Sequence, residues 1–248
     1  MAAHQNHIDM DIDDALIEKP YCFAIDDDGH RSHFYLYPAT LGKLHILRRH
    51  IEGLGIDAEA LTRDPFTETL RLATDKKEQS CRILAYHTIR DKEQLFDFEA
   101  VEQRTSYFKL HLTHEELATM LIHLLTAGNV EAYKRHLGIT KEGDRARRVA
   151  ELKRQGQKAQ SEVTFGGKSV YGALIDVACE RYGWTYDYVL WGISATNLQL
   201  ILADRVQTMF LTDDDRRRIP SGLTNQETDV INADDKANRG RILSMDWR

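Results

Sequence analysis

The sequence predicts a mainly α-helical protein: a helical bundle with a small N-terminal β-hairpin, a disordered acidic N-terminus and a polar C-terminal tail. Apolar residues recur at three- and four-residue steps along most of the chain, which is the spacing of one helical face. Only 4 prolines occur in 248 residues, and the regularly spaced turn signals of a sandwich or barrel are absent. Apolar residues make up 42% and charged residues 29%, so we expect a globular core.

The N-terminal part is predicted to contain a disordered lead-in and one hairpin. Residues 1–19 are polar and acidic, a composition typical of mobile termini. Residues 21–25 and 33–37 are β-prone, and the aspartate- and glycine-rich segment 26–30 between them is typical of a hairpin turn. We therefore expect two antiparallel strands here.

Helices follow from residue 40, where the apolar spacing becomes helical. Thr40 can cap a first helix, which Gly55 ends. Further helices are predicted near residue 65, over 76–89 and over 98–108.

A capping box predicts the start of a central helix. Thr113 is followed three residues later by Glu116, the pattern in which each residue caps the other. The helix has an unusually wide apolar face and ends at Gly128, and Asn129 can cap the next helix, which ends at Gly138.

The C-terminal half is predicted to be a separate helical domain. A helix over 170–182 ends at Gly183, a short helix runs through Trp191, and a long helix follows from Ser194. The apolar stripe of that long helix is Leu198, Leu202, Val206 and Met209. The expected organisation is a domain over 20–155, a linker over 156–167, a domain over 168–219 and a mostly disordered tail over 220–248.

Charge and cysteine usage favour a cytoplasmic protein. The formal net charge of −6 gives no general attraction to nucleic acid or anionic lipid. Cys22, Cys81 and Cys179 are odd in number and far apart, which indicates a reducing compartment. The N-terminus lacks the features of a signal peptide, and no run of eighteen apolar residues occurs, so we expect neither export nor a membrane span.

The motifs that carry chemistry are incomplete, so no catalytic residue, metal site or cofactor is predicted. The segment 166–169 ends like a phosphate-binding loop, but Glu162 stands where the first glycine is required. The alternating aspartates from Asp9 lack the glycine and glutamate of a calcium loop. His114 and His123 are nine residues apart, whereas a zinc-protease helix needs a spacing of four.

A basic stretch between residues 141 and 160 leaves one further possibility open. Such residues can follow a phosphate backbone, but no aromatic residues are interleaved for base stacking. A solvated helix face is the simpler interpretation, and nucleic-acid binding is the least favoured function. The basic residues are Arg145, Arg147, Arg148, Lys153, Arg154 and Lys158.

Aromatic residues are concentrated between Tyr182 and Trp191, where five large rings occur in ten residues. Core packing is the commonest fate of such rings, but aromatic residues also dominate the hot spots of protein interfaces. We therefore expect a surface for an apolar partner segment to be formed or bordered by a set of aromatic and leucine residues. These are Trp184, Tyr188, Trp191, Leu198 and Leu202.

The segment 166–204, GGKSVYGALIDVACERYGWTYDYVLWGISATNLQLILAD, resembles the C-terminal part of small tail-region proteins of tailed phages and prophages, a group that includes tail assembly chaperones. The aromatic corner, the WGIS turn and the NLQLILAD helix are particularly similar. The resemblance implies a cofactor-free protein in the bacterial host cytoplasm that keeps the apolar tape measure protein soluble during tail assembly. A structural tail or baseplate component is the alternative within the same group. The partner is then the tape measure protein or another tail protein, and a homo-oligomer is left open.

Overall fold

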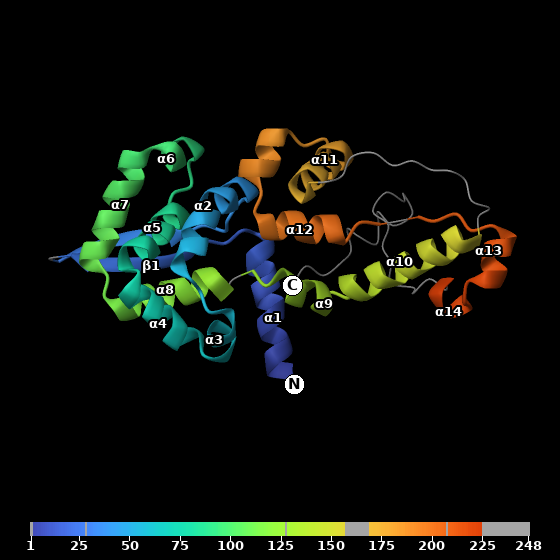
Figure 1. Ribbon diagram of the computed structural model, residues 1–248, viewed down its shortest axis with the longest axis horizontal. Coiled ribbons are helices and arrows are strands. Elements are labelled where there is room, and N and C mark those ends of the chain that lie inside the picture. The colour runs from blue at the N-terminus through green and yellow to red at the C-terminus, as the bar shows by residue number, and fades with distance from the viewer. Residues whose placement is uncertain (1, 28, 127, 157–168, 207, 225–248) are drawn as a thin grey trace. The chain divides into compact units, whose positions relative to one another are not determined.

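The computed structural model in Figure 1 describes residues 2–27, 29–126, 128–156, 169–206 and 208–224. The chain divides into two compact units. The first consists of Met1–Tyr133 and Gly167–Leu202, and the second of Lys134–Gly166 and Ala203–Arg248. The C-terminal domain expected over 168–219 is thus shared between the two units. The expected linker 156–167, apart from Gly156, and the tail from residue 225 lie outside the described residues.

The predicted hairpin is confirmed. Strand β1 (Tyr21–Asp27) pairs antiparallel with β2 (His30–Leu36), and Phe23 stands opposite Phe34. Burial alternates along β1, because one face of the hairpin lies on the core and the other faces solvent.

The helices expected from residue 40 onward are also present. They are α2 (Leu41–Leu54), α4 (Pro65–Asp75), α5 (Lys77–Thr88), α7 (Phe98–His111), α8 (His114–Thr126) and α9 (Val130–His136). Two further short helices, α3 (Ala58–Arg63) and α6 (Lys92–Phe96), were not predicted. Figure 1 shows the hairpin beside the helices α5, α7 and α8. The fully buried Leu84, Phe108 and Leu121 come from these three helices, which makes α8 a central helix as its wide apolar face predicted.

Local caps set the helix ends where the sequence placed them. The Lys43 amide donates to Thr40 Oγ1 at 3.3 Å at the start of α2, and Gly55 ends that helix with φ 64°. The Thr113 amide donates to Glu116 Oε2 at 2.9 Å, and the Glu116 amide donates to Thr113 Oγ1 at 3.2 Å. The predicted capping box is therefore formed on both sides.

The N-terminal segment differs from the expectation of a disordered lead-in, because helix α1 spans Ala2–Leu16. Its apolar residues Ile8, Ile12 and Ala15 recur at helical spacing and pack against Tyr133 and Leu200. The polar and acidic composition of residues 1–19 predicted disorder and outweighed this short apolar stripe. Contact with residues far along the chain supplies the burial that the segment lacks by itself.

Three helical segments complete the first unit. They are α11 (Val170–Tyr182), the π-helical turn η1 (Tyr188–Gly192) and α12 (Ala195–Ala203). The long helix expected through Met209 is wrong, since α12 ends at Ala203. Val206, the next residue of the expected apolar stripe, is 37% exposed in the observed conformation and so adds little burial.

The second unit contains α10 (Ile139–Gly156), α13 (Asp213–Arg218) and α14 (Ser221–Thr224). Arg145 Nε donates to the Leu223 carbonyl at 2.9 Å, and Lys153 Nζ donates to the Phe210 carbonyl at 2.7 Å. Arg147 lies 3.4 Å from Asp144. Arg145 and Lys153 therefore join α10 to later segments of its own unit, whereas Arg147 pairs within its own helix. The two contacts made by Arg145 and Lys153 weaken the case for a nucleic-acid surface there.

Candidate partner-binding surface

The segment α11–η1–α12 is fastened to the rest of the first unit at the start of α12. Glu18 Oε1 accepts hydrogen bonds from the Ser194 amide at 2.7 Å and from Asn197 Nδ2 at 3.2 Å. The Ala195 amide donates to the Ala39 carbonyl at 2.9 Å, next to a bridge between Thr40 and Ser194. Three distant parts of the chain meet at this joint, so the aromatic corner that precedes it is held in place.

The two leucines of the predicted surface lie in a core beneath that corner. Leu198 is fully buried and packs with Leu41, Val189 and Ile193, while Leu202 is half-buried on the same cluster. Leu198 therefore supports the corner and offers nothing to a partner. An aspartate at this position is expected to unfold the unit, so it would not test binding.

The predicted aromatic residues fall into two groups. Trp184 stacks on Tyr182 with ring centroids 4.6 Å apart, and Tyr188 meets Trp184 edge to face at 5.3 Å. Trp184 is half-buried, whereas Tyr188 is 43% exposed. The rings form a short ladder that ends at the surface in Tyr188.

Trp191 belongs to the other group and lies between η1 and α2. A Cβ atom built on Gly42 would come within 2.6 Å of the indole, so the ring lies directly on the backbone of α2. The indole also packs against the buried cluster of Ile89 and Leu95, and it meets the ring of Phe96 edge to face at 5.7 Å. Trp191 is therefore half-buried.

Lys92 links the segment that carries Tyr188 to Trp191. Lys92 forms an ion pair with Asp187, and its Nζ lies 5.6 Å from the Trp191 ring centroid. Phe96 is 64% exposed and Tyr186 is 63% exposed. We call these side chains together the corner surface; its members are Lys92, Phe96, Tyr186, Asp187, Tyr188 and Trp191.

Phe96 was missed by the sequence reasoning. It is the last residue of α6, and Asp97 and the exposed Phe98 follow it, so two aromatic side chains flank the residue that caps α7. An aromatic residue on each side of a helix cap was the available signal.

A second group of polar side chains is enclosed at the C-terminal end of α5. Lys43 Nζ donates to the Ile89 carbonyl at 2.8 Å, and Arg104 donates to the Thr88 carbonyl at 3.2 Å. Burial lowers the pKa of Lys43 to about 8 and that of His87 to about 3. Lys43 is only 3% exposed, so the arrangement satisfies the last carbonyls of α5 and is not open to a substrate.

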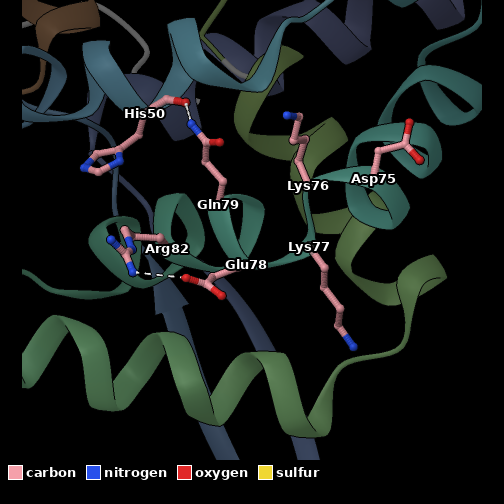
Figure 2. A pocket seen from close by; sticks show the side chains of 7 residues that line it. All are labelled: His50, Asp75, Lys76, Lys77, Glu78, Gln79 and Arg82. Atoms are coloured by element: carbon pink, nitrogen blue, oxygen red, sulfur yellow. Dashed lines mark hydrogen bonds and ion pairs between the residues drawn. The ribbon is translucent and has the colours of Figure 1, made fainter.

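A cavity of about 360 Å³ lies at the start of α5, shown in Figure 2. Gln79 Nε2 donates to the His50 carbonyl at 2.7 Å, and Arg82 lies 3.6 Å from Glu78. Lys76 and Lys77 point away from each other in the figure. The charged groups lining this hollow therefore do not converge on one point. Its lining consists of His50, Asp75, Lys76, Lys77, Glu78, Gln79 and Arg82.

Other candidate sites find no support in the described part of the chain. Its His, Cys, Asp and Glu side chains form no cluster of three or more suited to a metal ion. No described helix is long and apolar enough to cross a membrane. Most of the glycine-rich segment 166–169 lies outside the described residues, and Ser169 caps α11 by accepting a hydrogen bond from the Gly172 amide at 3.2 Å.

In comparisons with known proteins, the chain matches no protein-family model, and no curated protein or solved structure matches it significantly.

Proposed function

We propose that this protein is a tail assembly chaperone of a tailed phage or prophage, which binds the tape measure protein in the host cytoplasm and keeps it soluble while the tail is built. The resemblance of residues 166–204 supports the proposal. One structural observation carries it further: the corner surface combines the exposed Phe96, Tyr186 and Tyr188 with the half-buried Trp191, which Phe96 contacts. Clustered aromatic anchors of this kind are typical of protein-binding surfaces.

The corner surface suits a helical partner segment. The segment that carries Tyr188 and Trp191 is anchored by Val189 and Leu190 in the Leu198 core and by the joint at Ser194, which lowers the cost of ordering it on binding. An amphipathic helix presents a stripe of apolar residues at i, i+3, i+4 and i+7. When this stripe packs on the corner surface, it is shielded from water. Covering that stripe is what keeps an apolar protein soluble.

Co-expression with the tape measure protein of the same genome tests the proposal. We expect the wild-type chain to keep the tape measure protein in the soluble fraction and to co-purify with it. The double variant Phe96→Ala/Tyr188→Ala should lose both effects, because interface aromatics of this type contribute about 2 kcal/mol or more each. The matched control is Phe66→Ala/Leu110→Ala, which removes side chains that are 45% and 78% exposed on α4 and α7.

Two results would contradict this function. One is equal solubility of the tape measure protein with the corner variant and with the control, while circular dichroism shows both variants folded. The other is detection of the protein in purified particles by mass spectrometry. That result would instead favour the structural tail or baseplate component.

A further inference from the structure

Carboxylates surround the exposed aromatic residues of the corner surface. From Asp91 to Glu99 the chain carries four carboxylates and one lysine, Lys92. That lysine is already paired with Asp187. The neighbouring Arg90 is turned to Tyr37, with its guanidinium 5.7 Å from the ring centroid. The edge of the corner surface formed by α6 and the start of α7 is therefore negative.

Helix caps hold two of these carboxylates, Asp91 and Asp97, in place. Asp91 Oδ1 accepts from the Glu93 amide at 3.2 Å, and Asp97 Oδ1 accepts from the Glu99 amide at 2.9 Å. Glu93 and Glu99 are exposed residues of the first turns of α6 and α7, where the helix dipole favours negative charge.

First-turn glutamates alone do not define a binding site, because Glu59 of α3 and Glu115 of α8 occupy equivalent positions. The difference is the neighbourhood. Phe96 and Phe98 are 64% and 74% exposed and lie within the same nine-residue segment as Glu93 and Glu99. An apolar anchor and a negative edge are thus presented together.

We propose that the segment bound at the corner surface is basic: an amphipathic helix whose apolar face packs on Phe96 and Trp191 and whose lysine or arginine side chains lie against Glu93 and Glu99. This inference deepens the proposed function and rests on it. Opposite charges at the edge of an interface speed association and fix its register, and like charges exclude acidic helices. The negative edge therefore selects among the many apolar helices of a cytoplasm.

Two synthetic helical peptides test the charge preference with the full-length protein. Both are about 18 residues long, or five helical turns, and share one leucine and tryptophan face. The polar face carries only lysine in one and only glutamate in the other, and binding is followed by fluorescence anisotropy of an attached dye. We expect the lysine peptide to bind at least tenfold more tightly, with a difference that shrinks as salt rises.

Charge-reversal variants locate the effect. Glu93→Lys/Glu99→Lys should weaken binding of the lysine peptide at least tenfold, and Glu93→Gln/Glu99→Gln should weaken it less. The control Glu59→Lys/Glu115→Lys makes the same change in net charge at the same helix positions and should stay within twofold of the wild type. Equal binding of the two peptides, or equal weakening by the control pair, would overturn the inference.

The same variants separate this inference from the proposed function. If Phe96→Ala/Tyr188→Ala loses the tape measure protein while Glu93→Lys/Glu99→Lys keeps both it and the lysine peptide, the charge preference is wrong and the function stands. If the charge variants behave as expected with the peptides but Phe96→Ala/Tyr188→Ala still binds the tape measure protein, the surface is basic-selective and the proposed function is wrong.

Discussion

Replacing Gly42 with alanine tests how Trp191 is held on α2. The new Cβ atom would lie 2.6, 2.7 and 2.8 Å from three atoms of the indole, closer than packed side chains approach. Alanine favours a helix over glycine by up to about 1 kcal/mol. Moving a packed ring off its site typically costs about 1–3 kcal/mol. We therefore expect Gly42→Ala to lower the free energy of unfolding by about 1 kcal/mol.

Urea denaturation followed by tryptophan fluorescence measures this change, because Trp184 and Trp191 both lie in the first unit. Gly172→Ala is the matched control. Gly172 is also in the first turn of a helix of that unit, and its added Cβ would meet Ser169 at an ordinary 3.5 Å. It should therefore stabilise the unit by up to about 1 kcal/mol.

A double-mutant cycle assigns the cost to the indole. In a Trp191→Ala background the space above Gly42 is open, so Gly42→Ala should become stabilising there, with a coupling of about 1–3 kcal/mol between the two positions. Stabilisation by Gly42→Ala in the wild-type background, equal to that of Gly172→Ala, would refute the packing of Trp191 on α2.

Three further predictions concern the joint, the capping box and the buried histidine. Glu18→Ala leaves the buried Ser194 amide without its acceptor and leaves Asn197 Nδ2 with the Leu16 carbonyl alone, so thermal melting should show a loss of about 1–3 kcal/mol, and Glu18→Gln, which keeps the oxygen, should lose less. Thr113→Ala removes the cap of α8 and should cost about 1 kcal/mol in urea denaturation; no loss would argue against the cap. Burial lowers the pKa of His87 from 6.5 to about 3, so only the unfolded chain binds this proton between those values. Stability should fall as pH falls from 6.5 towards 3, with a slope approaching about 1.4 kcal/mol per pH unit from this residue, and His87→Leu should lack that part of the slope.

Sequence alone determined the fold class and most helix ends. The caps at Thr40 and Thr113 and the glycines Gly55 and Gly183 were all predicted and are all present. The reason is that each depends on atoms within about four residues along the chain or on the backbone freedom of one glycine. The hairpin could be predicted for the same reason, because its turn and its β-prone strands are adjacent in sequence.

Only the tertiary structure decided which apolar side chains are covered. The sequence pattern placed Leu198, Trp191 and Tyr188 alike in the predicted partner-binding surface. In the structure Leu198 is fully buried, Trp191 is half-buried and Tyr188 is exposed. The acidic composition also obscured the short apolar stripe of α1, and the pattern extended α12 beyond its end at Ala203. Helical periodicity identifies the apolar side of an element, but burial depends on which distant segment reaches that side. Ile12 meets Tyr133 and Leu200 only in the folded chain, and Phe96 meets Trp191 there too, so local patterns cannot encode these contacts.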